Sequence, residues 1–264
     1  VIEVDQSLSF NRALVEKYDR PGPRYTSYPT APQFHQAFAM DDYHAAAQAS
    51  NQAAVPKALS LYIHIPFCKS LCYYCACNKI ITQKTHRAVE YLNYLKREIA
   101  MQAALFDRTR TLRQLHLGGG TPTYLTREQL AELMDCLHQA FNLDDSDEHE
   151  FSIEVDPRTI STEQIEHLRQ LGFNRLSFGV QDFDPDVQAA VNRQQSEEQI
   201  YALVAAARAA QFKSVSVDLI YGLPLQTVAS FDVTLSKIIA LRPDRIAAYS
   251  YAHLPELVRA QRLI

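Results

Sequence analysis

The 264-residue sequence lacks an apolar run as long as a membrane span, and it lacks an excess of positive charge. A spanning helix needs about 20 mostly apolar residues, so no membrane association is expected. The formal net charge is −4, which gives no reason to expect nonspecific binding to nucleic acid. The first residues, Val1–Asp5, have neither the basic region nor the apolar stretch of a signal peptide. We therefore expect a cytoplasmic protein, because free thiols persist in that compartment.

Cysteine is scarce, yet four of the five cysteines fall on one short stretch. They are Cys68, Cys72, Cys75 and Cys77. The first three have C-x3-C-x2-C spacing, and three protein ligands leave one metal position open, as in catalytic sites. Cysteine ligation suits zinc or an iron–sulfur cluster, and a fourth ligand from Cys77 or His64 would favour zinc. The fifth cysteine, Cys136, lies in a predicted helix and is expected to act as a small buried apolar residue.

Six predicted strands alternate with predicted helices in residues 57–264. The strands are expected at Ala58–Ile65, Gln114–Leu117, Phe151–Val155, Arg175–Val180, Ser214–Ile220 and Arg245–Tyr251. The alternation predicts an α/β fold with a parallel sheet, and such apolar strands favour coverage on both faces. No G-x-G-x-x-G follows the first strand, which disfavours a dinucleotide-binding domain. An open doubly wound sheet and a (β/α) barrel, whole or partial, are the two architectures left.

Capping-box patterns indicate where three of the intervening helices begin. They start at Thr126, Ser161 and Ser196. Two more helices are expected at about His86–Leu105 and Ser230–Leu241. Ahead of the first strand, the proline-punctuated segment Gly22–Pro32 should run extended, and a helix is expected at about Asp41–Asn51. The sequence therefore predicts an N-terminal arm and helix in residues 1–56, followed by the α/β core in residues 57–264.

Polar residues gather where the predicted strands end, which is the edge at which barrel enzymes assemble their sites. The glycines Gly118–Gly120 follow the second strand, Glu154 and Asp156 end the third, and Gln181 follows the fourth. Each has a plain structural explanation, such as a tight turn or an exposed salt bridge. Asp218 is different, because a charge inside an apolar strand must be paired or functional.

The C-x3-C-x2-C spacing, with Tyr74 just before its last cysteine, resembles the signature of radical S-adenosylmethionine (SAM) enzymes. The run Gly118–Pro122 likewise resembles the Gly-Gly-Gly-Thr-Pro motif of that superfamily. The resemblance implies a partial (β/α)6 barrel, similar to a TIM barrel, that carries a [4Fe–4S] cluster. It further implies that the cluster ligands are Cys68, Cys72 and Cys75, and that SAM binds the open iron.

A narrower resemblance is to the oxygen-independent coproporphyrinogen III oxidases. It rests on the segments Pro23–Pro29, Cys75–Lys79, Glu154–Pro157, Gly179–Asp182 and Asp218–Pro224. The family oxidatively decarboxylates coproporphyrinogen III to protoporphyrinogen IX in haem biosynthesis, through a 5′-deoxyadenosyl radical derived from SAM. An electron donor, unidentified here, and a monomeric state are also expected. The resemblance implies a C-terminal domain in family members, which we expect this chain to lack.

The same resemblance assigns roles to individual positions, including sites for two SAM molecules. Tyr62, Gly119 and Glu154 match positions that contact the SAM on the cluster. Tyr74, Gly120, Thr121, Gln181, Arg193, Asp218 and Ala252 match positions around the second. Tyr62 and the non-ligand Cys77 are the expected catalytic residues, and Arg24 on the arm is a candidate partner for a substrate carboxylate.

Two other functions are weighed against decarboxylation. A haem-carrying relative of the same superfamily would bind the cluster and haem without decarboxylating anything. A zinc-stabilised barrel acting as a binding module would contain zinc but neither iron nor sulfide. Metal content and product formation separate the three functions.

Overall fold

The computed structural model describes residues 9–20 and 29–264. The chain divides into two units, Val1–Ala49 and Ser50–Ile264. The division falls before the predicted boundary at residues 56 and 57, because Asn51 already belongs to the hydrogen-bond network of the larger unit. Its side chain donates to the Leu105 carbonyl oxygen at 2.8 Å and accepts from the Asp107 amide at 3.1 Å.

The described residues of the smaller unit form helix α1 (Arg12–Tyr18), the start of α2 (Met40–Asn51) and a 3₁₀ turn, η1 (Ala31–Gln33). Helix α1 was not predicted. It is capped by Asn11, whose side chain accepts a hydrogen bond from the Leu14 amide at 3.0 Å. Most of the segment predicted to be extended, including Arg24, lies outside the described residues.

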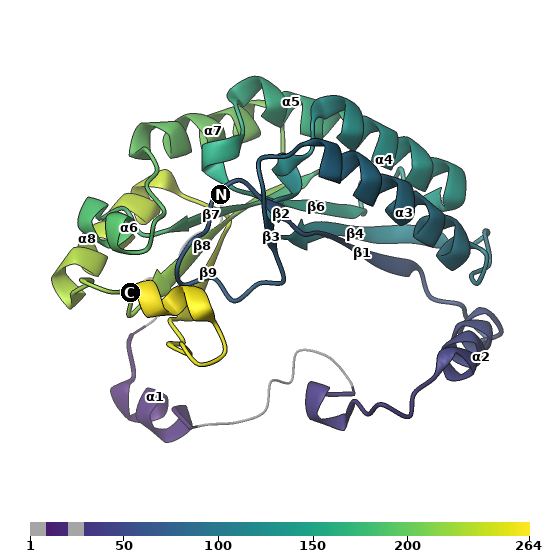
Figure 1. Cartoon of the computed structure of the whole chain (residues 1–264), viewed down its shortest axis with the longest axis horizontal. Coiled ribbons are helices and arrows are strands. Elements are labelled where there is room, and N and C mark those ends of the chain that lie inside the picture. Colours follow the sequence, from purple (N-terminus) through teal and green to yellow (C-terminus); the bar gives the residue numbers. More distant parts are fainter. Residues whose placement is uncertain (1–8, 21–28) are drawn as a thin grey trace. The chain divides into compact units, whose positions relative to one another are not determined.

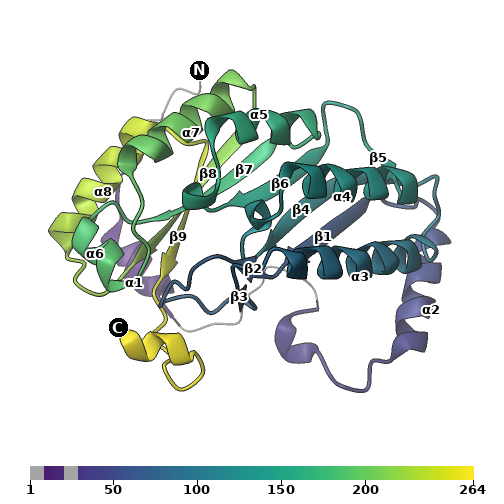
Figure 2. The same cartoon turned by 45° about the horizontal axis from the view of Figure 1, so that its top comes forward.

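One parallel sheet forms the centre of the larger unit, with strand order β1-β4-β6-β7-β8-β9 and β5 beside β4. The strands are β1 (Leu59–Ile65), β4 (Thr111–Gly119), β5 (Asn142–Leu143), β6 (Glu150–Val155), β7 (Arg175–Gln181), β8 (Ser214–Tyr221) and β9 (Arg245–Ser250). All six predicted strands are present. Within the described residues β1 and β9 are the two edges, so the curved sheet in Figures 1 and 2 is an open, partial barrel.

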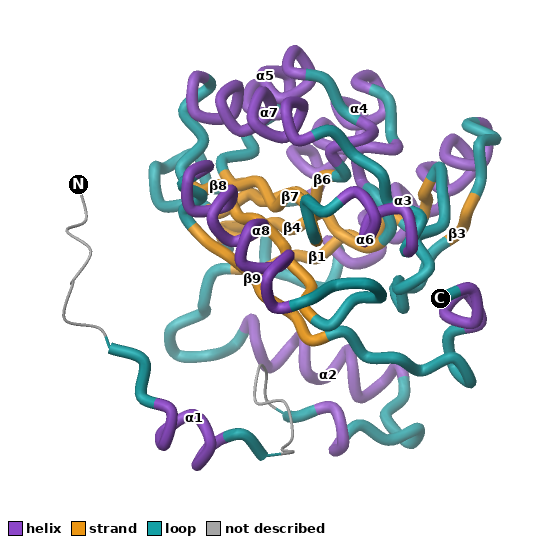
Figure 3. Tube along the Cα trace, turned by 90° about the vertical axis from the view of Figure 1, so that its left-hand side faces the viewer, coloured by secondary structure: helices purple, strands orange, loops and turns teal. Residues whose placement is uncertain are grey.

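Helices pack along one face of this sheet, as Figures 1 and 3 show for α4, α5 and α7. The helices are α3 (His86–Ala103), α4 (Arg127–Ala140), α5 (Thr162–Gln170), α6 (Pro185–Ala190), α7 (Glu197–Ala209) and α8 (Val228–Leu241). Three short 3₁₀ turns are η2 (Pro122–Tyr124), η3 (Pro157–Thr159) and η4 (Arg259–Leu263). None of the helices in the part of the chain described here is long and apolar enough to cross a bilayer.

The helix starts follow the capping chemistry. Complete capping boxes are present at Thr126 and Ser161, as predicted. At Ser196 only half of the box forms: the Gln199 amide donates to the Ser196 hydroxyl at 3.3 Å, but the Gln199 side chain is turned toward Pro157, to whose carbonyl oxygen it donates at 2.8 Å. Helix α8 begins two residues before its predicted start, because Thr227 caps it.

The main core lies between the helices and one face of the sheet. In β6 and β7 buried and partly exposed residues alternate, and Ile153 and Phe178 are fully buried against the helices. The expectation of strands covered on both faces is therefore wrong for the described residues. The opposite face carries polar side chains, including Ser152 and Ser177, and it lines a cavity of about 490 Å³.

Candidate active site at the carboxyl edge of the sheet

Cys68 ends β2 (Phe67–Cys68), and the other three clustered cysteines lie on the loop from there to β3 (Ile80–Ile81), which pairs with β2 in parallel. This pair of strands was not predicted. The loop is attached to the turn after α6 by two hydrogen bonds. The Tyr73 amide donates to the Val191 carbonyl oxygen at 3.0 Å, and the Asn192 side chain donates to the Leu71 carbonyl oxygen at 2.7 Å. The cysteines are thus held in place by a segment far away in the sequence.

The thiols differ in their acidity. Burial raises the pKa of Cys68. The hydrogen bond from the Cys77 thiol lowers the pKa of Cys75 to about 6, which favours its thiolate form. A thiolate is the form that ligates a metal. Lys79 donates to the Cys75 carbonyl oxygen at 2.7 Å, which places a cation beside that thiolate.

The glycine run Gly118–Gly120, at the carboxyl end of β4, is joined to the end of β1 and to β2. The Gly120 amide donates to the Ile65 carbonyl oxygen at 2.8 Å, and the Thr121 hydroxyl donates to the sulfur of Cys68 at 3.5 Å. Gly119 has φ +118°, and a Cβ there would lie 2.7 Å from the ring of His64. Only glycine avoids both the backbone strain and the clash, which lets the backbone approach a ligand closely.

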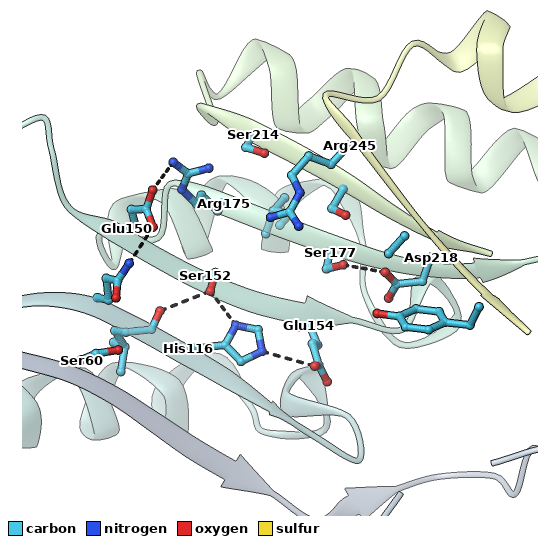
Figure 4. A pocket seen from close by; sticks show the side chains of 16 residues that line it. Ser60, His116, Glu150, Ser152, Glu154, Arg175, Ser177, Ser214, Asp218 and Arg245 are labelled. Atoms are coloured by element: carbon cyan, nitrogen blue, oxygen red, sulfur yellow. Dashed lines mark hydrogen bonds and ion pairs between the residues drawn. The ribbon is translucent and has the colours of Figure 1, made fainter. Parts of the chain in front are cut away.

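Glu154 connects this glycine run with a chain of ring side chains on the open face of the sheet. Its carboxylate accepts from the Gly119 amide at 3.1 Å and lies 3.3 Å from Nε2 of His116. The His116 ring is stacked on Tyr62, and the Tyr62 hydroxyl lies 2.9 Å from Nδ1 of His64. Figure 4 shows His116 between Ser152 and Glu154. His116 was not singled out in the sequence, although it alternates with buried leucines in β4.

Asp218 projects from β8 toward the same cavity in Figure 4. It accepts a hydrogen bond from the Ser177 hydroxyl at 3.2 Å. Burial raises the pKa of Asp218 to about 6. The carboxylate is therefore poorly compensated, and a cationic or hydrogen-bonding ligand would stabilise its charged form.

Most of the predicted site residues line one cavity of about 210 Å³ at this edge. They are Cys68, Cys72, Tyr74, Cys75, Cys77, Gly119, Gly120, Thr121, Glu154, Gln181, Arg193 and Asp218. Tyr62 and Ala252 are not among the lining residues. Tyr62 stacks on His116, which lies beside the cavity-lining Glu154. The Gln261 side chain donates to the carbonyl oxygens of both Ala252 and Tyr74.

Two charged residues that line the cavity, Asp156 and Arg158, were given no role from the sequence. The Asp156 carboxylate pairs with Arg158 at 2.7 Å and with Arg193 at 3.4 Å. Burial alone would raise the pKa of Asp156, but the two guanidinium groups outweigh it and lower the pKa. Arg158 was not predicted. Its position just after a strand end, in the run Asp156-Pro157-Arg158, was the available signal.

The donors present at this edge fit an iron–sulfur cluster. Three cysteine sulfurs face one cavity, a hydroxyl and two guanidinium groups donate to those sulfurs, and glycine backbone lies beside them. Within residues 9–20 and 29–264 no three His, Cys, Asp or Glu side chains come close enough to share a single metal ion. A cluster requires no such convergence, because each cysteine binds a different iron.

Comparison with known proteins gives concordant matches. The family model described as the radical SAM superfamily matches residues 62–238. An oxygen-independent coproporphyrinogen III oxidase from Pseudomonas aeruginosa is 50% identical over 258 residues, covering 98% of this chain and 56% of that protein. One from Escherichia coli K12 is 50% identical over 262 residues, covering 98% and 55%.

A solved structure is similar as well. It is coproporphyrinogen III oxidase (HemN) from Escherichia coli, described as a radical SAM enzyme. Its TM-score is 0.87 at 48% sequence identity, with 98% of this chain and 56% of that chain covered. The chain therefore spans about half the length of the relatives it matches.

Proposed function

Because this chain belongs to the radical SAM superfamily, we propose that it is the cofactor-binding part of an oxygen-independent coproporphyrinogen III oxidase. The observation that carries the proposal is the single cavity into which the cysteine loop, the glycine run, Glu154 and Asp218 project. The 50% identity to coproporphyrinogen III oxidases supports the choice of substrate. In the proposed reaction two propionate groups of coproporphyrinogen III become vinyl groups, each losing carbon dioxide, one hydrogen atom to a 5′-deoxyadenosyl radical and one electron to an external one-electron acceptor.

The residues of the chain would bind and orient the cofactors. Cys68, Cys72 and Cys75 would hold the [4Fe–4S] cluster, which with SAM supplies a 5′-deoxyadenosyl radical. The Glu154 carboxylate, oriented by the Gly119 amide, is placed to accept hydrogen bonds from an ammonium or ribose group. Tyr62 would act through its stacking on His116, which lies beside that carboxylate.

The proposal also includes a second SAM molecule. Its site would use Tyr74, Gly120, Thr121, Gln181, Arg193, Asp218 and Ala252. Gln181 has φ +70°, a conformation rare for a residue with a side chain, and this kind of strain is concentrated at functional sites. Arg193 already donates to the Gly179 carbonyl oxygen at 2.6 Å, so it would bind a cofactor carboxylate only with its remaining donors or after a rearrangement.

Substrate and partners complete the proposal. The polar cavity of about 490 Å³ shares Glu154, Ser177 and Asp218 with the cofactor cavity and offers adjoining space. Cys77 would be catalytic without ligating the cluster. We further propose a monomer in the cytoplasm that accepts electrons from a separate donor.

The test of cluster ligation compares two cysteines after anaerobic reconstitution with iron and sulfide. Cys72→Ala is expected to abolish the brown cluster absorbance and the bound iron, because Cys72 lies buried among the site residues. Cys136→Ala, on α4, is expected to leave both intact. Equal losses in the two variants would refute the ligand assignment, and zinc without iron or sulfide would exclude the whole mechanism.

The reaction itself is tested by supplying coproporphyrinogen III, SAM and dithionite under anaerobic conditions. Carbon dioxide and vinyl-containing porphyrinogen are the expected products. In a version of the protein as long as its relatives, an intact cluster and intact SAM cleavage without carbon dioxide would contradict decarboxylation and favour the haem-carrying alternative.

A further inference from the structure

The sulfur of Cys72 accepts hydrogen bonds from two guanidinium groups. Nη2 of Arg158 and Nη1 of Arg193 each lie 3.4 Å from it. Cys72 is 7% exposed, and the side chains of Arg158 and Arg193 are 19% and 9% exposed. In such a poorly hydrated setting, charged donors stabilise negative charge on the sulfur more strongly than they would in water.

Asp156 holds Arg158 in position. Nε of Arg158 lies 3.0 and 3.2 Å from the two carboxylate oxygens, and Nη2 lies 2.7 Å from one of them. The backbone amide of Arg158 also donates to this carboxylate, at 3.1 Å. Asp156 cancels only one of the two positive charges of Arg158 and Arg193. One net positive charge therefore stays beside Cys72.

The other side of the guanidinium group is held by the segment that also fixes the cysteine loop. Nη1 of Arg158 donates to the Asn192 carbonyl oxygen at 3.5 Å, while the Asn192 side chain donates to the Leu71 carbonyl oxygen at 2.7 Å. Arg158 is therefore bound between Asp156, Asn192 and Cys72. It is a fixed donor to the sulfur, unlike a mobile surface cation.

We propose that Arg158 is a positioning residue that raises the reduction potential of the iron–sulfur cluster through its hydrogen bond to Cys72. This inference rests on the proposed ligation of the cluster by Cys72. Hydrogen bonds to the sulfurs and nearby charge are among the factors that set cluster potentials. Because the reduced cluster carries one more negative charge, donors at Cys72 stabilise it more than the oxidised cluster and make uptake of the electron easier.

The experiment is an anaerobic redox titration of the reconstituted chain, followed by electron paramagnetic resonance without SAM or substrate. Dithionite is oxidised and the cluster takes up one electron. In Arg158→Gln we expect the ratio of reduced to oxidised cluster at a fixed potential to fall about tenfold, a shift of about 59 mV for one electron. Arg158→Lys, which keeps the charge but loses the planar fork, is expected to shift less.

The matched control is Arg113→Gln. Arg113 also pairs with an aspartate, Asp144 at 3.0 Å, but near the amino end of β4, away from the cysteine loop. Its cluster potential is expected to equal that of the unmodified chain. An unchanged potential in Arg158→Gln overturns the proposal. So does loss of the cluster from both Arg158 variants while they stay folded by circular dichroism, because Arg158 would then serve assembly.

Failure of this inference is distinguishable from failure of the proposed function. If Cys72→Ala retains the cluster, the ligation on which the inference rests is wrong. If the ligation holds and the potential does not move, only the role of Arg158 is wrong. Decarboxylation is not measured in the titration, so its outcome does not affect the result.

Discussion

Asp218 is a carboxylate inside β8, between the fully buried Val217 and Leu219. Within the described residues the Ser177 hydroxyl donates a hydrogen bond to it, and the positive charges of Arg193 and Arg245 act on it less strongly than burial does. Burial therefore disfavours the charged form and raises the pKa of Asp218 to about 6. The folded chain binds this proton more tightly than the unfolded chain does.

This raised pKa predicts a dependence of stability on pH. The stabilising contribution of protonated Asp218 is fully present below the pKa of the unfolded chain and is lost as pH rises through about 6. Relative to Asp218→Asn, the free energy of unfolding should fall by about 1 to 3 kcal/mol between pH 4 and pH 7, roughly 1.4 kcal/mol per pKa unit with a reduction for partial exposure. Urea unfolding of the cofactor-free chain at several pH values measures it.

A control for this experiment is Asp135→Asn, which changes an exposed carboxylate on α4. It should retain the pH dependence of the unmodified chain. If the free energy of unfolding depended on pH in the same way in Asp218→Asn and in the unmodified chain, the Asp218 carboxyl group would have the same pKa in the folded and unfolded chain. That result would contradict the prediction.

Among single residues, the sequence predicted those that belong to compact motifs but not those whose partners are distant in the sequence. Cys68, Gly120 and Thr121 were predicted from local runs. Arg158 was not, because nothing in its neighbourhood in the sequence indicates that it contacts Cys72, 86 residues away. Contacts of that kind depend on how separate strand ends are brought together.

Among the elements, β4 ends in a glycine that a residue with a side chain could replace only with strain. Gly119 combines a positive φ with the ring of His64 2.7 Å from the position of a Cβ. Gly172, which follows α5, also has a positive φ, of +95°, but the nearest atom to its Cβ position would be 3.8 Å away. A side chain at Gly172 would therefore meet backbone strain alone, whereas a side chain at Gly119 would meet both backbone strain and a steric clash.

We predict that Gly172→Ala lowers the free energy of unfolding by about 1 to 2 kcal/mol, because of the backbone strain alone. Gly119→Ala should lower it by at least about 1 kcal/mol more, because the His64 ring must also move. Urea midpoints of the two variants and the unmodified chain give the comparison. Equal losses would mean that the His64 ring relaxes without cost.

The bounds of the elements were predictable where periodicity and caps agreed. The boxes at Thr126 and Ser161 are local patterns, and they are present as predicted. The half-formed box at Ser196 differs because Gln199 has a better partner in Pro157, which comes from another part of the chain. A local pattern cannot indicate such competition.

On the scale of the molecule, the larger unit has one main core. It joins residues from β1 to β8 with residues of α3, α4, α5, α7 and α8, and Leu137 of α4 is fully buried in it. A smaller apolar cluster, which includes Val187 and Leu223, packs near α6. Because nearly all elements share the main core, the larger unit should unfold cooperatively.

Leu137→Ala should therefore lower the free energy of unfolding by about 2 to 5 kcal/mol. The unfolding transition should still have the same midpoint when it is followed by different probes. Far-ultraviolet circular dichroism and tyrosine fluorescence are suitable, because the chain has no tryptophan and 14 tyrosines. Leu257→Ala, at a side chain 80% exposed, should change stability by less than about 0.5 kcal/mol. Two separate transitions for the sheet would contradict a single core.

The sequence by itself determined the parallel α/β architecture, the cysteine and glycine motifs and most of the residues that line the candidate site. These features depend on residue spacing, strand and helix periodicity and caps, which are local properties. Only the tertiary structure decided that the open face of the sheet is polar and that Arg158 and Arg193 meet at Cys72. Those outcomes depend on strand register and on which distant segments share an edge of the sheet.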